Sequence, residues 1–268
     1  MKIVTTIGLA FFMALSVLPP AIFAHQVTEI YLTGVDLAAQ GKFSEAKKIF
    51  QEITAADPLY ERPKRCLKIL ADLESQKINH RTAAHLFKGL TYFYQDRFQE
   101  ALVQANLALQ INPRYERAYS ARGGVYFGLG KYDQAVADYT RALEIDPQYA
   151  GAYYNRGCAY LKTRQYERAM ADFDRALKIA PKYVGAFHNR SIAHFLQGQY
   201  LWALADCRRA LEINPRLAEA HLTQAQVLEE LGKEEEAAAA YKKFLQYAPP
   251  TLSREIDYAR KRLGFLEK

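Results

Sequence analysis

The amino-acid sequence predicts an all-α fold in which antiparallel helix pairs stack into a solenoid. The first observation is a period of 34 residues between prolines: Pro113, Pro147, Pro181, Pro215 and Pro249. The second is that each period carries two apolar stripes at helical spacing, one on either side of a short turn. Because a single pair cannot bury its apolar face, stability must come from stacking.

Small residues mark where the two helices of each period approach closely. An alanine lies 12 residues before each proline: Ala101, Ala135, Ala169, Ala203 and Ala237. The preceding helix carries small residues at the same period: Gly89, Gly123, Gly157, Ser191 and Ala225. Each period ends at its proline, which cannot continue a helix and also restricts the residue before it.

The pattern resembles the tetratricopeptide repeat, in which aromatic, glycine, tyrosine, alanine and proline positions recur in a fixed order. One copy shows all of them: Tyr153, Gly157, Tyr160, Tyr166, Ala169, Phe173, Ala176 and Pro181. Six copies are predicted, at 27–60, 82–115, 116–149, 150–183, 184–217 and 218–251. The resemblance implies a right-handed superhelix.

Two segments of the expected domain, 25–268, fall outside the period. Residues 61–81 place four apolar residues on one helical stripe, which predicts one extra helix: Cys66, Leu67, Leu70 and Leu73. Residues 252–268 have an apolar face opposite a charged one, which is typical of a helix that caps a solenoid.

Residues 1–24 have the order of a secretory signal peptide. A lysine is followed by an apolar run at 3–18, then by two prolines and small residues before Ala24. The run is shorter than the ~20 residues of a membrane-spanning helix. We therefore expect cleavage after Ala24 and an exported protein of bacterial type, periplasmic or secreted. The alternative is an uncleaved segment that anchors the chain in a membrane.

Composition argues against several classes of protein. Half of the 268 residues are apolar and 24% are charged, which argues against a disordered chain. The net charge is +7, but the basic residues are spread among 29 acidic ones, so no nucleic-acid partner is expected. The 3 cysteines include no CxxC pair, so neither a disulfide framework nor a structural zinc site is expected.

An arginine precedes an aspartate by 16 residues in three copies: Arg122 and Asp138, Arg156 and Asp172, Arg190 and Asp206. Where the arginine is replaced by Gln224, the aspartate is replaced by Ala240. This joint presence predicts an ion pair between the two helices of one copy. The alternative is an arginine ladder for an anionic ligand. We also expect the arginines three residues after each aspartate to share it: Arg141, Arg175 and Arg209.

No catalytic motif is found in the sequence. HExxH, GxSxG and a glycine-rich phosphate loop are absent. His194 stands where other copies have Tyr126 and Tyr160, and Cys207 stands where they have Tyr139 and Phe173, so core packing accounts for both. We expect no enzymatic activity, no cofactor, no metal and no small-molecule substrate.

The resemblance implies a groove for a partner protein, lined by the first helix of each copy. Carried over by repeat position, the lining is mostly apolar and aromatic: Leu86, Leu90, Phe93, Tyr94, Arg117, Phe127, Tyr154, Leu161, His188, Ile192 and Phe195. Affinity should concentrate in the anchors Phe127, Tyr154 and Phe195. The alternative is that these aromatics only pack between repeats.

The sequence thus predicts a non-catalytic scaffold of the cell envelope that binds an extended or helical segment of another protein. The alternative is a structural subunit that stacks with itself or within a secretion, pilus or cell-wall complex. A membrane is a partner only if the N-terminal segment is uncleaved.

Overall fold

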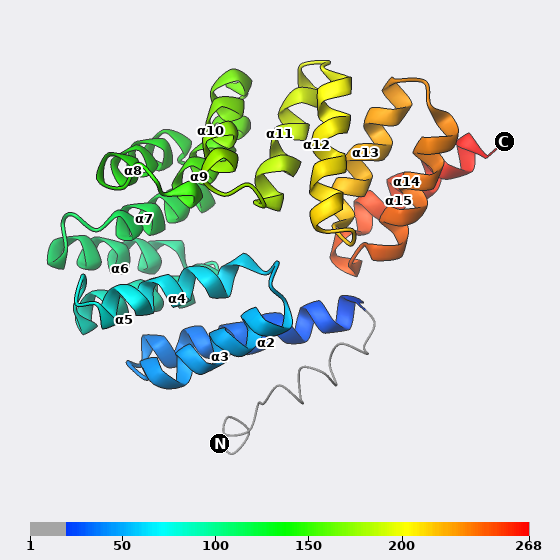
Figure 1. Ribbon diagram of the computed structural model, residues 1–268. Coiled ribbons are helices and arrows are strands. Elements are labelled where there is room, and N and C mark those ends of the chain that lie inside the picture. Colours follow the sequence, from blue (N-terminus) through cyan, green and yellow to red (C-terminus); the bar gives the residue numbers. More distant parts are fainter. Residues whose placement is uncertain (1–19, 268) are drawn as a thin grey trace. The chain divides into compact units, whose positions relative to one another are not determined.

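The computed structural model describes residues 20–267, and these residues form α-helices, one short 3-10 helix and no strand (Figure 1). The chain divides into two compact units, one that ends at Pro147 and one that begins at Gln148. Each unit consists of antiparallel helix pairs, which confirms the predicted all-α solenoid class.

In the first unit the described helices are α2 (Pro20–Ala39), α3 (Phe43–Ala56), α4 (Glu61–Glu74), α5 (His80–Tyr94), α6 (Phe98–Ile111), α7 (Glu116–Gly128) and α8 (Tyr132–Ile145). The pairs α2/α3, α5/α6 and α7/α8 fall in the copies predicted at 27–60, 82–115 and 116–149. Helix α4 is the extra helix.

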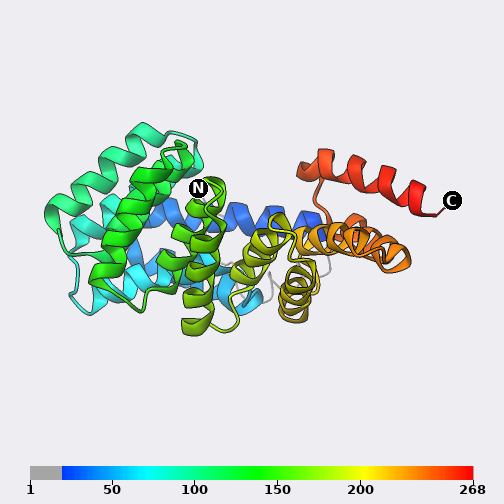
Figure 2. The ribbon, with the colours of Figure 1, turned by 90° about the horizontal axis from the view of Figure 1, so that it is seen from above.

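In the second unit the described elements are α9 (Ala150–Lys162), α10 (Tyr166–Ile179), α11 (Val184–Leu196), α12 (Tyr200–Ile213), α13 (Ala218–Glu230), α14 (Glu234–Tyr247), η1 (Pro250–Leu252) and α15 (Ser253–Leu266). Helix α15, red in Figure 2, packs beside α14. Glu229 joins the two, because it accepts hydrogen bonds from Tyr241 and from Arg262. The last helix therefore caps the final pair.

Small residues set the distance between the helices of a pair. A Cβ atom at Gly157 would lie 2.7 Å from Cε1 of Phe173, and one at Gly123 would lie 2.8 Å from Cε1 of Tyr139. These aromatic rings therefore lie directly on the backbone of the first helix, which only glycine permits at this distance.

Helix α5 packs differently from the later first helices. In α7, α11 and α13 the third residue of the copy is a fully buried alanine: Ala118, Ala186 and Ala220. In α5 the matching Ala84 is only half-buried, whereas Ala83 and Phe87 are fully buried. The reason is that α5 packs mainly along α2 instead of along the second helix α3. The sequence did not predict this change of partner.

Helix α4 completes this N-terminal block, which consists of α2, α3 and α4. Its Cys66 and Leu70 belong to the same apolar cluster as Tyr31 of α2, and Leu90 and Tyr94 of α5 pack against that cluster. The helix ends at Glu74 instead of continuing to residue 81, because Gln76 adopts a left-handed φ of 60°. Asn79 then caps α5 by accepting a hydrogen bond from the Thr82 N–H at 2.9 Å.

Most of the predicted signal segment lies outside the described residues. The backbone of residues 20–24 belongs to α2. No helix within residues 20–267 combines the length and the apolar character needed to cross a membrane.

Candidate functional site

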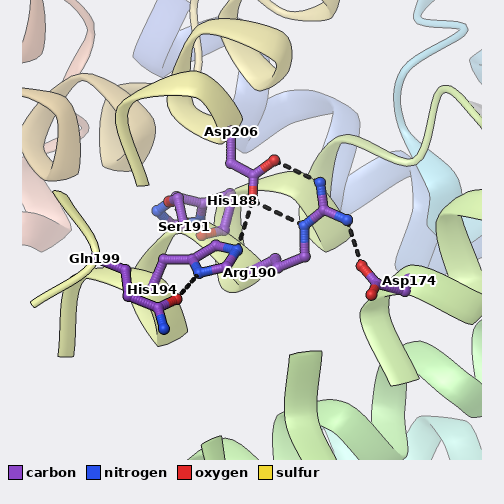
Figure 3. Close-up of polar contacts among 7 residues, drawn as sticks. All are labelled: Asp174, His188, Arg190, Ser191, His194, Gln199 and Asp206. Carbon is purple, nitrogen blue, oxygen red and sulfur yellow. Dashed lines mark hydrogen bonds and ion pairs between the residues drawn. The ribbon is translucent and has the colours of Figure 1, made fainter. Parts of the chain in front are cut away.

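The predicted arginine–aspartate spacing forms two-pronged ion pairs within a repeat. Arg190 Nε and Nη2 donate to Asp206 Oδ2 and Oδ1 at 2.8 and 2.6 Å (Figure 3). The other two copies repeat this geometry, with Arg122 on Asp138 and Arg156 on Asp172. All three aspartates are only 5% exposed, so the predicted ion pairs are confirmed as part of the core.

Two of these arginines also reach the preceding repeat. Arg122 Nη1 donates to Asn106 Oδ1 at 2.9 Å, and Arg190 Nη1 donates to Asp174 Oδ1. The hydrogen bonds from Asp138 are the main cause of the raised pKa of Arg122. Because these guanidinium groups already bond to acceptors on two repeats, an arginine ladder for an anionic ligand is disfavoured.

The expectation that the later arginines share these aspartates is wrong for two of them. Arg141 Nη1 donates to Glu144 at 2.6 Å, and Arg209 pairs with Glu212. Both arginines are exposed and pair with an acid one helical turn further on, away from the buried aspartates.

His194 has the packing role that the sequence predicted. Its Nδ1 is hydrogen-bonded to Gln199, and its Nε2 lies 3.8 Å from Asp206 Oδ2 (Figure 3). Its ring stacks on Trp202, with centroids 6.3 Å apart. Cys207 is fully buried, as its repeat position predicted.

In the first unit, the N-terminal block covers most of the predicted groove residues. Leu86 is 5% exposed and belongs to a cluster that Ile69 and Leu73 of α4 pack against. Leu90 and Tyr94 are half-buried in the cluster of the same block, where the Arg62 guanidinium lies 5.2 Å from the Tyr94 ring. This part of the lining contacts the chain's own helix.

Arg117 is also engaged by the N-terminal block. Its Nε donates to Asp72 Oδ2 at 2.9 Å, and the Tyr115 hydroxyl donates to the same oxygen at 2.7 Å. Beside them, Lys77 Nζ lies 2.6 Å from Glu116, which is only 1% exposed. These contacts fasten the end of α4 to the start of α7, so Arg117 has a structural partner that sequence reasoning missed.

Three predicted lining aromatics pack on the residue that opens the second helix of their own repeat. Phe93 lies 5.5 Å from Phe98, Phe127 lies 5.3 Å from Tyr132, and Phe195 lies 5.8 Å from Tyr200, between ring centroids. All three lining residues are half-buried. Their main contact is therefore within the repeat, as the packing alternative expected.

The second unit brings its predicted lining residues together through hydrogen bonds between successive first helices. Asn189 Nδ2 lies 3.1 Å from both Tyr154 Oη and Cys158 Sγ, which joins α11 to α9. His188 Nε2 lies 3.2 Å from Thr223 Oγ1, which joins α11 to α13. Each link connects the fifth residue of one copy to the sixth residue of the next, 35 positions later. We call this set of bonds the polar ladder.

Half-buried apolar side chains flank the polar ladder on the same helices. Leu161 lies near the end of α9, and Ile192 lies one turn after His188 on α11. Burial is the main cause of the lowered pKa of His188, which favours its neutral form. The first helices α9, α11 and α13 thus present a surface that is neutral, partly apolar and rich in hydrogen-bonding groups.

The chemistry of the described residues gives no catalytic arrangement. Burial raises the pKa values of the Cys66 and Cys207 thiols to about 12, so neither forms a reactive thiolate at neutral pH. Within residues 20–267, no group of three or more His, Cys, Asp and Glu side chains is placed to hold a metal ion.

Comparison with known proteins identifies the repeats. The family described as TPR repeat matches residues 123–163, and the family described as tetratricopeptide repeat matches 150–183, 184–217 and 218–251. The last three matches have the bounds of three predicted copies. The chain is therefore a tetratricopeptide-repeat protein. Such proteins are generally non-catalytic, and these repeats support a protein-interaction scaffold.

Solved structures share this fold. PilF of Pseudomonas aeruginosa is 20% identical, with 69% of this chain and 88% of that chain covered and a TM-score of 0.61. PilW is 26% identical, with 63% and 79% covered and a TM-score of 0.60. MamA is 21% identical, with 59% and 93% covered and a TM-score of 0.54. No curated protein matches the sequence significantly.

Proposed function

We propose that the protein is a scaffold of the cell envelope that binds a segment of another protein on the first helices of its second unit. The observation that carries this proposal is the polar ladder, which is flanked by half-buried apolar residues on α9, α11 and α13. A partner segment, extended or helical, buries apolar side chains on Leu161 and Ile192 while the ladder supplies hydrogen-bonding groups.

The site is narrower than the groove that the sequence predicted. Leu86, Leu90, Tyr94 and Arg117 already contact the N-terminal block, so a partner gains little from them. Of the three predicted anchors, Tyr154 belongs to the polar ladder, whereas Phe127 and Phe195 pack on the next helix of their own repeat. Tyr154, Asn189 and Ile192 are therefore the residues we expect to matter most for binding.

Two observations support a place in the bacterial envelope. Residues 1–24 have the order of a secretory signal peptide. PilW, at 26% identity, is described as a widely conserved type IV pilus biogenesis factor. The protein is exported to the periplasm or secreted, or it is anchored by an uncleaved N-terminal segment. It needs no cofactor and acts on no small-molecule substrate.

The proposal is tested by placing a photo-crosslinking amino acid at Ile192 in cells that make the protein. The control carries the same group at Ala239, an exposed residue on the second helix α14. We expect one defined adduct from position 192 that is absent from position 239. Asn189→Ala should weaken the adduct without changing the circular dichroism of the purified protein.

Two results would count against the site. The first is equal adduct formation from both positions. The second is an adduct from position 192 that Asn189→Ala and Tyr154→Ala leave unchanged, because the partner would then contact neither end of the ladder.

A further inference from the structure

The turn between α11 and α12 exposes three large apolar side chains. Leu196, Leu201 and Trp202 are 52%, 72% and 68% exposed. They stand together around a short turn, and Trp202 is held in place by stacking on His194. We call these three residues the apolar patch. Exposing so much apolar surface at one place is unfavourable in water and commonly marks an interface.

The repeat fold does not require this patch. Where this copy has Leu201 and Trp202, the neighbouring copies have Glu167 and Arg168 on one side and Glu235 and Glu236 on the other. Copies in the first unit have polar residues there too: Gln99, Glu100, Asp133 and Gln134. The helix pair therefore forms with polar residues at these positions, and packing within the fold does not explain the apolar pair.

Opposite charges flank the apolar patch on the two adjacent turns. The turn after α9 offers three exposed cations, Lys162, Arg164 and Arg168, against one acid, Glu167. The turn after α13 offers four exposed acids against the single cation Lys233: Glu230, Glu234, Glu235 and Glu236. One end of this surface is therefore basic and the other is acidic.

Contacts between the turns show that the three groups adjoin. Gln197 in the central turn donates to Glu167 on the basic side. On the acidic side, Tyr200 interacts with Glu230, whose carboxylate raises the pKa of the tyrosine, and Arg208 Nη2 lies 3.8 Å from Glu236. Basic end, apolar patch and acidic end thus form one strip along the turns of the second unit.

We infer that this strip is a self-complementary interface through which two copies of the chain form a dimer. A two-fold axis through Trp202 sets the basic end of each copy against the acidic end of the other, and it sets the two apolar patches against each other. Two-fold interfaces use the same surface twice, so they require this internal complementarity. The inference does not depend on the proposed partner site on α9, α11 and α13.

The charge pattern distinguishes a second copy from other occupants. A surface that docks on anionic lipid is basic throughout, whereas this strip carries a cluster of acids that such a membrane would repel. A patch with charges of one sign would suit an unrelated partner of opposite charge. Opposite signs at the two ends match the same strip turned through a half-rotation.

The first test uses the only tryptophan of the chain, Trp202, whose emission reports the patch alone. Sedimentation and fluorescence of the full chain are measured together over a range of concentrations. We expect a reversible dimer whose formation shifts the emission to shorter wavelength. Trp202→Phe gives a dimer of similar strength, while Leu201→Glu raises the dissociation constant at least about tenfold.

The matched control is Val103→Glu, which changes an apolar residue that is 54% exposed on α6, outside the strip. It should leave the dissociation constant unchanged. Because all variants share the same N-terminal segment, differences among them report the strip. A chain that stays monomeric at all concentrations, or a dimer that Leu201→Glu leaves intact, would overturn the inference.

A charge exchange tests the two-fold arrangement itself. One variant, Lys162→Glu with Arg168→Glu, has two acidic ends; the other, Glu234→Lys with Glu235→Lys, has two basic ends. Each variant alone should be monomeric, and an equal mixture should form the mixed dimer. If both variants dimerise alone as the wild type does, the charged ends do not meet and the arrangement is wrong.

Discussion

Asp72 on the extra helix α4 holds Arg117 at the start of α7, with Oδ2 and Nε 2.9 Å apart. The same carboxylate accepts the Tyr115 hydroxyl at 2.7 Å. A residue that the repeat pattern assigns to a partner groove is therefore occupied by a helix that the repeat pattern does not contain. This one carboxylate ties the N-terminal block to the repeat that begins at residue 116.

Replacing Asp72 with alanine should lower the free energy of unfolding of the first unit by about 2 kcal/mol, because two half-buried donors lose a charged acceptor. Urea denaturation followed by circular dichroism measures the change. Glu74→Ala is the matched control on the same helix. Its pair with Lys47 is exposed, so the loss should stay below about 1 kcal/mol. Equal losses in both variants would show that Asp72 has no special role.

Gly157→Ala should destabilise the second unit by about 1–3 kcal/mol, because the new Cβ would lie 2.7 Å from the Phe173 ring and force that ring to move. Thermal unfolding provides the measurement. Gly264→Ala is the control, since no atom lies within 4 Å of a Cβ at that position of α15. There alanine should stabilise the helix by up to about 1 kcal/mol. A neutral Gly157→Ala would mean that the helices separate without cost.

The repeat period in the sequence was enough to predict most of the fold. Prolines and small residues at fixed spacing identify the pairs from α5 to α14, and the joint presence of Arg190 and Asp206 predicts their ion pair. Such features are local to one repeat, so one sequence contains several independent copies of the evidence. The exposed ends of the array have no such internal comparison.

The N-terminal block could not be predicted in this way. Phe87 stands at a repeat position where other copies have Ala121, Asn155 and Asn189, which is a hint that this face of α5 is covered. The period does not say which helix covers it, because that depends on where the chain turns after α4. The assignment of Leu86, Leu90 and Tyr94 to an open groove assumed regular stacking, which α5 does not have.

Stability of the second unit should fall as the pH drops below neutrality, and His188 should account for part of the fall. Burial lowers its pKa below the ordinary value of 6.5, so the unfolded chain binds the proton more readily. This contribution is fully present above pH 6.5 and is lost as the pH falls through 6.5 towards the folded pKa. Glu219 and Thr223 face the ring, and the carboxylate of Glu219 opposes the shift only partly.

Urea denaturation of the wild type and of His188→Gln at pH 8 and pH 5 isolates this effect. The stability difference between the two proteins should change in favour of the variant at pH 5. A difference that is the same at both pH values would show that His188 titrates alike in the folded and unfolded chains.

Cys158 should react with a thiol reagent before Cys66 and Cys207 do. It is half-buried, whereas the other two are buried and burial raises their pKa values to about 12. Labelling of the native protein followed by mass spectrometry should therefore give one modified cysteine, and labelling in urea should give three. Rapid native labelling of Cys66 would show that α4 detaches readily from α2 and α5.

The partnership of α5 with α2 limits how such a chain can evolve. Repeat arrays change length by duplicating or deleting whole units, and a new unit must offer its neighbours the surface that they already bury. A unit inserted after α6 would meet the small Ala118 that the later first helices also present. A unit inserted before α5 would instead have to replace α2 and cover the large ring of Phe87. Duplication can therefore lengthen this protein only on the C-terminal side of its first regular repeat.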